Sequence, residues 1–198
     1  MRFALGLLAA AIALGACSDY VPAPTSNPGG CDNDIVTCMD QRTTPPSTVI
    51  DPSKKYTATV HTPRGDFTIA FVDPKLAPQT VNNFVYLSQN HYYDGLIFHR
   101  VVPGFVVQGG DPLGNGTGGP AYKLPNETNP SNWPRGTVGM ASSSAGVSGS
   151  QFFITTGDAP SLATSGVYNH FGQVASGMEV IDKIQVGDRM TSIDITAS

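Results

Sequence analysis

Apolar and polar residues alternate along two neighbouring stretches near the middle of the chain. The first covers residues 56–60, and the second brings in Phe67, Ile69 and Phe71. A period of two is typical of a strand with one buried face. Residues 62–65 between them contain proline and glycine, which favour a turn. The pattern therefore predicts a β-hairpin over residues 56–71.

The spacing of apolar residues becomes helical between residues 78 and 90. Pro78 suits the first turn of a helix, and four apolar residues between positions 81 and 87 fall on one face. Further strands are predicted at residues 136–141, 151–155, 170–175 and 191–195. The pattern also predicts a short helix at residues 177–184 and a long Gly- and Pro-rich loop at residues 112–134. Many short strands with two helices indicate a mostly β domain. A closed antiparallel β-barrel would leave such a domain no exposed edge.

Residues 97–111 hold two apolar runs around a turn at Pro103 and Gly104. Each run carries one strong polar side chain, Arg100 in the first and Gln108 in the second. A half-buried sheet seldom holds an arginine without a partner, so this hairpin is a candidate site. Taken alone, Arg100 could instead form a surface ion pair, and Gln108 could be an ordinary residue at the rim of a sheet.

Two segments carry a resemblance to a known family. Residues 97–111 and 149–156 resemble the signature of the cyclophilin-type peptidyl-prolyl cis-trans isomerases, and the similarity runs from about residue 56 to residue 195. The resemblance implies a closed eight-stranded antiparallel β-barrel capped by two helices, with residues 54–198 as the folded domain. It also implies isomerisation of X-Pro bonds in unfolded or folding polypeptides, with no cofactor and no metal.

The chemistry of this reaction explains why an arginine would be needed. Rotation about an X-Pro bond faces a barrier of about 18–20 kcal/mol, which comes from amide resonance. In the twisted amide the nitrogen lone pair leaves resonance and becomes a hydrogen-bond acceptor. A fixed cationic donor beside that nitrogen therefore binds the transition state more strongly than the planar ground state. Arginine suits this role because its guanidinium stays charged and is rigidly forked.

The resemblance assigns roles to residues in both motifs. Arg100 corresponds to the catalytic arginine, Gln108 to a glutamine that bonds the substrate backbone and orients the arginine, and Phe105 to a wall of the proline pocket. The positions implied to bind the substrate are Val106, Gly116, Ala141, Ser142, Ser143, Gln151, Phe153, Leu162, Tyr168 and His99. Among these, Phe153 corresponds to the pocket floor.

Several positions depart from the family pattern. Val106 stands where methionine is frequent, and the pocket stays apolar there. Ser142 and Ser143 replace a common Asn-Ala pair, a mild change where the backbone does the binding. Tyr168 replaces a histidine, as in many bacterial relatives, and Ser161 replaces a tryptophan, which argues against strong cyclosporin binding.

Other chemistries are weighed against the same residues. His99 beside Arg100 suggests a general base, but the reaction moves no proton, so we favour an orienting or packing role. The glycines between residues 109 and 119 lack the Gly-Lys-Ser/Thr of a phosphate loop, and the serines between 142 and 150 lack the Gly-x-Ser-x-Gly of a serine hydrolase. Two rival functions remain open: a proline-peptide binding module or chaperone with little turnover, and a structural envelope lipoprotein.

The charge of the chain argues against nucleic-acid binding. The net charge is −4 at pH 7, the pI is near 5.4, and no run of basic residues occurs. Phosphate contacts need clustered lysines and arginines. A length of 198 residues leaves room for one domain plus appendages, and we expect a monomer.

The N-terminus has the pattern of a targeting signal. Arg2 precedes an apolar run over residues 3–14, which is too short to span a bilayer comfortably, and Leu14 and Cys17 fit a bacterial lipobox. We therefore expect a signal peptide over residues 1–16, a lipid on Cys17 and an extracytoplasmic, membrane-anchored lipoprotein. A plain secretory signal with a chance cysteine is the alternative. In a Gram-negative cell, Ser18 would resemble the outer-membrane-sorted type, and the domain would face the periplasm.

Residues 17–53 are rich in Pro, Thr, Ser, Asn and Asp and show no sustained period, which predicts a flexible tether. Cys31 and Cys38 lie within this segment. With Cys17 lipidated, they make an even pair in an oxidising compartment, so we expect a disulfide between them. A weak metal site is the alternative, although two cysteines alone form an incomplete ligand shell.

Overall fold

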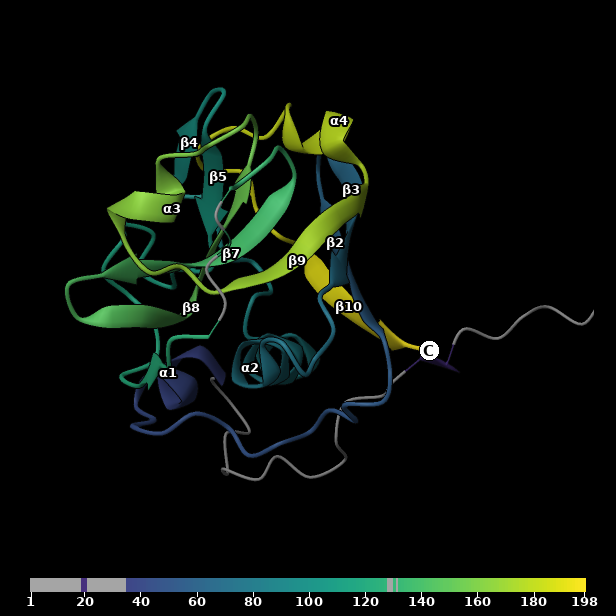
Figure 1. Cartoon of the computed structure of the whole chain (residues 1–198), viewed down its shortest axis with the longest axis vertical. Coiled ribbons are helices and arrows are strands. Elements are labelled where there is room, and N and C mark those ends of the chain that lie inside the picture. The colour runs from purple at the N-terminus through teal and green to yellow at the C-terminus, as the bar shows by residue number, and fades with distance from the viewer. Residues whose placement is uncertain (1–18, 21–34, 128–129, 131) are drawn as a thin grey trace, which may run out of the picture.

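The computed structural model describes residues 19–20, 35–127, 130 and 132–198, and this part of the chain forms ten strands and four helices (Figure 1). The strands are β1 (Asp19–Tyr20), β2 (Tyr56–Thr62), β3 (Gly65–Phe71), β4 (Arg100–Val102), β5 (Val106–Gly109), β6 (Lys123–Leu124), β7 (Thr137–Ser143), β8 (Gly146–Thr155), β9 (His170–Ser176) and β10 (Ser192–Ala197). The helices are α1 (Ile35–Asp40), α2 (Pro78–Gln89), α3 (Leu162–Ser165) and α4 (Met178–Ile181). Among the described residues no helix has the length and apolar character to cross a membrane.

The longer strands form close to the predicted positions, whereas β1 and β6 lie in segments that were predicted as tether and loop. β2 and β3 make the expected hairpin, and every second residue of β2 is buried, as its period of two requires. β8 is longer than predicted, because it begins at Gly146 rather than at residue 151. Its first five residues are glycine and serine except for Val147, so they carry little strand signal, but they pair with β6 and β7. Pairing with β6 and β7, rather than the local sequence, therefore extends β8 towards its N-terminal end.

The strand pairs of the described chain are antiparallel, and they run in the order β1-β10-β2-β3-β9-β7-β8-β5-β4, with β6 beside β8. The mostly β fold is confirmed, but a closed eight-stranded barrel with two helices is not. The sheet has ten strands, and within the described residues no ladder joins its end strands, β1 and β4. Instead, residues 95–98 make individual backbone hydrogen bonds to residues 187–190, including one of 2.9 Å from Phe98 N to Asp188 O. Both segments are irregular, so the sheet ends in a seam of single contacts.

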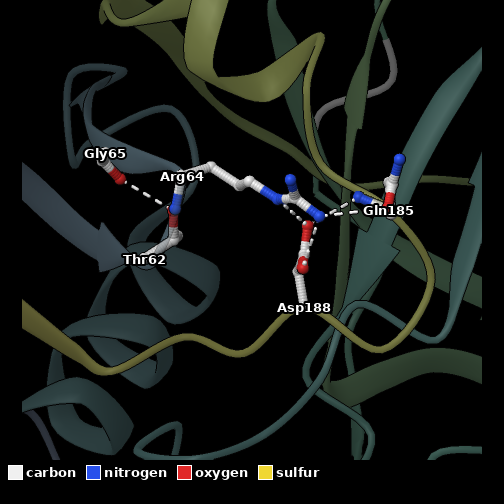
Figure 2. Close-up of polar contacts among 5 residues, drawn as sticks. All are labelled: Thr62, Arg64, Gly65, Gln185 and Asp188. Atoms are coloured by element: carbon white, nitrogen blue, oxygen red, sulfur yellow. Dashed lines mark hydrogen bonds and ion pairs between the residues drawn. The ribbon is translucent and has the colours of Figure 1, made fainter.

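A side-chain cluster ties the β2–β3 turn to the loop that leads into β10 (Figure 2). Nε of Arg64 donates to Oδ2 of Asp188 at 2.8 Å, and Nη2 donates to Oε1 of Gln185 at 3.0 Å. The hydrogen bond from Arg64 lowers the pKa of Asp188 below its usual value. Exposed ion pairs of this kind contribute little to stability, so the main effect is to fix the loop beside the seam.

Helix α2 lies against the strands near β8 and β10 (Figure 1) and contributes Val81, Phe84 and Leu87 to the main core. Phe84 of α2 is fully buried and meets Phe71 and Phe152 edge to face, with ring centres 5.6 and 5.3 Å apart. Aromatic pairs in this geometry add about 0.5–1.5 kcal/mol each to the burial of their area. Because Phe152 lies on β8, the helix fixes the strand that also carries Gln151 and Phe153.

Residues 40–50, which we call the strap, pack against the folded domain. The carboxylate of Asp40 accepts a hydrogen bond of 2.7 Å from the hydroxyl of Tyr92, and Oδ1 of Asn82 on α2 accepts one of 2.7 Å from the backbone N–H of Val49. The prediction of a flexible tether is wrong for this segment. Its polar backbone finds partners on α2, and no local pattern in the sequence reveals them.

Several predictions concern residues that the structure does not describe. The signal peptide over residues 1–16, Cys17 and Cys31 lie outside the described residues. The backbone of Cys38 belongs to α1, but its side chain is likewise not described. The lipid and the Cys31–Cys38 disulfide therefore stay predictions.

Candidate active site

The β4–β5 hairpin sets Arg100 directly opposite Gln108. Its turn contains Gly104 with a φ of 72°, a conformation that favours glycine. β5 also pairs with β8, where Gln108 lies opposite Phe153. Directly opposed residues on neighbouring strands point to the same face of a sheet. Arg100, Gln108 and Phe153 therefore form one row across three strands.

The guanidinium of Arg100 lies at the exposed end of this row. Its Nη1 donates to Oε1 of Gln108 at 3.4 Å, and its Cζ lies 5.7 Å from the centre of the Phe105 ring. A guanidinium over an aromatic ring gains cation–π attraction at this distance. The two neighbours hold one side of the cation, and the arginine is otherwise exposed to solvent.

A cavity of about 220 Å³, the first cavity, opens beside the row and is lined by both apolar and polar side chains. Val106, Phe153 and Leu162 are nearly fully buried in its walls, and the Tyr168 ring meets Phe153 edge to face with centres 5.6 Å apart. The complete lining is Arg100, Phe105, Val106, Gln108, Ala141, Ser142, Phe153, Leu162, Ser165 and Tyr168. Nine of these ten residues were predicted from the sequence, and Ser165 was not.

A second cavity of about 370 Å³ adjoins the first, and the two share Gln108, Ala141 and Ser142. Its lining is Gln108, Gly116, Thr117, Gly118, Lys123, Ala141, Ser142, Ser143, Ala145, Gly146, Ser148 and Gln151. The predicted residues Gly116, Ser143 and Gln151 all line it. Lys123 is the one charged residue in this lining. The two cavities together form a continuous groove, because they share Gln108, Ala141 and Ser142.

Trp133 supports the first cavity from below, and sequence reasoning missed it. Its ring is 1% exposed and lies 5.3 Å from the Phe153 ring at an angle of 38°. A Cβ atom at Gly139 would lie 2.7 Å from the Trp133 ring, so a glycine is needed there. Within the described structure the indole Nε1 has no hydrogen-bond partner. The one available signal was that Trp133 is the sole tryptophan of the chain, placed in a loop otherwise rich in Gly and Pro.

His99 lies next to Arg100 in the chain but lines neither cavity. Both of its ring nitrogens are buried, and neither has a hydrogen-bond partner among the residues described. Burial lowers the pKa of His99 below its usual value; the carboxylate of Asp111 opposes this shift and Arg100 adds to it. The predicted place of His99 in the substrate groove is therefore wrong, because its ring is turned into the protein.

The groove offers an apolar surface on which a small ring can pack, at Phe153. The guanidinium of Arg100 and the side-chain amide of Gln108 lie at the edge of this surface. No cluster of three or more His, Cys, Asp or Glu side chains suited to a metal occurs in the described ranges. An apolar cavity with a few convergent polar groups is the usual form of a ligand site. This arrangement can hold an apolar ring while a guanidinium donates to an atom beside it.

Comparison with known proteins agrees with this geometry. The family model of the cyclophilin type peptidyl-prolyl cis-trans isomerase/CLD matches residues 57–196. A peptidyl-prolyl cis-trans isomerase of Synechococcus elongatus is 46% identical over 140 residues, which cover 70% of this chain and 94% of that protein. A cyclophilin type isomerase of Cryptosporidium parvum is similar in structure, with a TM-score of 0.61 and 31% identity over 73% of this chain and 98% of that one. A second structure of that protein, determined in the presence of the dipeptide Ala-Pro, matches with a TM-score of 0.59 and 31% identity over 72% and 98% of the two chains. The chain therefore belongs to the cyclophilin-type peptidyl-prolyl cis-trans isomerases, and its function is peptidyl-prolyl cis-trans isomerisation.

Proposed function

We propose that this isomerase acts on X-Pro segments of secreted or envelope polypeptides, and that Arg100 stabilises the twisted amide. The observation that carries the proposal is the row of Arg100, Gln108 and Phe153 beside a cavity of about 220 Å³ whose walls include Phe105, Val106 and Leu162. A proline ring seated over Phe153 would bring its nitrogen towards the guanidinium. The relative studied in the presence of Ala-Pro supports an X-Pro segment as the ligand.

The proposed mechanism uses binding alone. The walls of the first cavity hold the proline ring, and Gln108 and the backbone of residues 141–143 hold the flanking peptide. As the amide twists, its nitrogen becomes an acceptor, and donation from Arg100 strengthens in that state only. The barrier of about 18–20 kcal/mol falls equally for both directions of isomerisation.

The cellular setting is proposed from the N-terminal sequence. The pattern supports a signal peptide over residues 1–16, a lipid on Cys17 and a Cys31–Cys38 disulfide in an extracytoplasmic compartment. Since one chain builds both cavities, a monomer would suffice for activity.

The test is turnover of an X-Pro tetrapeptide by the full-length protein in detergent, measured by exchange NMR. Arg100→Ala should lower kcat/KM by about 10²–10³-fold, the usual loss for a group that stabilises developing charge. The fold should remain intact, because Arg100 is exposed. The matched control is Arg189→Ala, the same change at an exposed arginine outside both cavities. Turnover near that of the wild type in Arg100→Ala would refute the mechanism.

The same measurement tests the rival functions. Slow exchange in the well-folded wild-type protein, together with X-Pro peptide binding, would favour a binding module or chaperone. Slow exchange without peptide binding would favour a structural envelope lipoprotein.

A further inference from the structure

A chain of amide groups links the loop after β5 to Arg100. Nε2 of Gln151 donates to the backbone carbonyl of Gly118 at 2.8 Å. Nε2 of Gln108 donates to Oε1 of Gln151 at 3.1 Å, and Oε1 of Gln108 accepts from Arg100 at 3.4 Å. The carbonyl, the two side-chain amides and the guanidinium therefore form one continuous series of hydrogen bonds.

The series has a direction, because a backbone carbonyl can only accept. The carbonyl of Gly118 requires Gln151 to turn its NH₂ group towards the loop. The oxygen of Gln151 then faces Gln108, so Gln108 must turn its own NH₂ group towards Gln151. Gln108 is left with its oxygen facing Arg100. A reversed amide at Gln108 would set NH₂ against the guanidinium, donor against donor. Gln151 is only 6% exposed, so water cannot easily compensate a reversed amide there.

Asp111 fixes the carbonyl at the start of the series. It is 1% exposed, and its carboxylate accepts from the backbone N–H of Leu113 at 2.8 Å, of Asn115 at 3.0 Å and of Gly116. A Cβ atom at Gly118 would overlap Oδ1 of Asp111, so the backbone there packs directly on the carboxylate. The loop is thus folded around a single buried anion.

We infer that Asp111 and Gln151 are positioning residues, which set the orientation of Gln108 and so hold the Arg100 guanidinium at the edge of the first cavity. The inference rests on the proposed role of Arg100. It also gives the loop two tasks, since Gly116, Thr117 and Gly118 line the second cavity as well. The loop that borders one cavity orients the cation of the other.

The experiment is a double-mutant cycle in the full-length protein, with Asp111→Asn, Gln151→Met and the two combined. Asparagine keeps the size of Asp111 but presents a donor to the N–H of Leu113, and methionine keeps the length of Gln151 without its hydrogen bonds. Each single variant should lower kcat/KM about tenfold, mainly through kcat, because orientation of the arginine matters most in the transition state. If both residues act through one series of hydrogen bonds, the kcat/KM of the double variant should be within about twofold of the kcat/KM of the less active single variant.

A spectroscopic readout separates positioning from loss of structure. The Nε–Hε resonance of Arg100 should shift in the same direction in both single variants, with little change in the urea midpoint of Gln151→Met. The control is Asp73→Asn, the same change at an exposed Asp that accepts from the N–H of Lys75 and lines neither cavity. It should leave turnover and the Arg100 resonance unchanged.

Three results would overturn the inference: single variants within twofold of wild-type kcat, a double variant whose loss is the product of the single losses, or an unmoved Arg100 resonance. If Asp111→Asn fails to fold, Gln151→Met still decides through its kcat and its Arg100 resonance. Failure of the mechanism itself is recognised separately, because Arg100→Ala would then retain turnover.

Discussion

At the scale of single residues, the floor of the first cavity is a pair of packed aromatic rings, tilted by 38° to each other. Phe153 faces the groove, and Trp133 lies beneath it with ring centres 5.3 Å apart. A ligand pressed against Phe153 would change the surroundings of the indole without touching it. This geometry makes Trp133 a natural reporter, because it is the sole tryptophan of the chain.

We predict that X-Pro peptides change the emission of Trp133 in a saturable way. The reason is that a proline ring seated on Phe153 alters packing around the indole. The measurement is a fluorescence titration of the full-length protein, with Trp133→Phe as the blank. An X-Ala peptide of the same length is the control, and an equal response to it would show that the emission does not report the proline seat.

Three histidines respond to pH in two opposite ways. Burial lowers the pKa of His99 and of His170 below the usual value. For His61, burial also acts to lower the pKa, but hydrogen bonds to Asp66 and Asp194, at 3.0 and 3.3 Å, raise it overall. A lowered pKa means that the unfolded chain, with histidine pKa values near 6.5, takes up protons before the folded one. Stability from His99 and His170 is therefore lost as pH falls below about 6.5.

The contribution of His61 has the opposite sign, since it is fully present below about pH 6.5 and is lost as pH rises through the raised pKa. We predict that His99→Gln loses less stability than the wild type between pH 7.5 and 5.5, and that His61→Asn loses more. Urea midpoints at the two pH values measure this. The reverse order of the two variants would contradict the assignment of the shifts.

At the scale of elements, the strap is the main difference from the sequence-based prediction. Ile50 is 8% exposed, and backbone groups of the strap bond to Asn82 of α2 and to residues 121–122. The abundance of Pro, Thr and Ser shows only that apolar residues in this segment do not follow a helix or strand period. Its partners lie more than 30 positions away in sequence, as with Val49 and Asn82, so local reading could not find them.

We predict that a protein beginning at Lys54 is less stable than one beginning at Ile35. The loss should be about 2–4 kcal/mol, from one buried apolar side chain and several hydrogen bonds. Urea unfolding of the two proteins measures the difference. Equal midpoints would mean that the strap contributes nothing to the fold. If turnover is measured for the protein that begins at Lys54, the protein that begins at Ile35 is its matched control.

At the scale of the whole molecule, the groove is assembled from segments far apart in the chain. β4 and β5 bring the cation and the amide, β8 brings the floor, and the α3 region brings Leu162 and Tyr168. The two family motifs identified most of these residues before the structure did. Ser165 and Trp133 were missed because both lie in segments without a motif or a period. His99 was misplaced because adjacency to Arg100 in the chain says nothing about the direction of its ring.

We predict that Cys17→Ser moves the full-length protein from the membrane fraction to the soluble fraction. A thioether-linked lipid on Cys17 would be the anchor, and serine cannot carry it. The measurement is fractionation of cells that express each form, with Cys38→Ser as the control that keeps Cys17. A Cys17→Ser protein that stays with the membrane would show that the anchor lies elsewhere.

The longer strands, helix α2 and the mostly β class followed from the sequence, because the period of apolar residues reports which faces are buried, whereas α1, α3, β1 and β6 were not predicted. The motifs around Arg100 and Phe153 also pointed to the reaction, because its chemistry needs those side chains. Three features depended on the folded molecule: the strap on α2, the unclosed ends of the sheet, and the loop at Asp111 meeting Gln151. Each is a contact between distant segments, and such contacts depend on strand register and on which buried polar groups find partners. Neither quantity is encoded in a local pattern, so packing in three dimensions was needed to establish them.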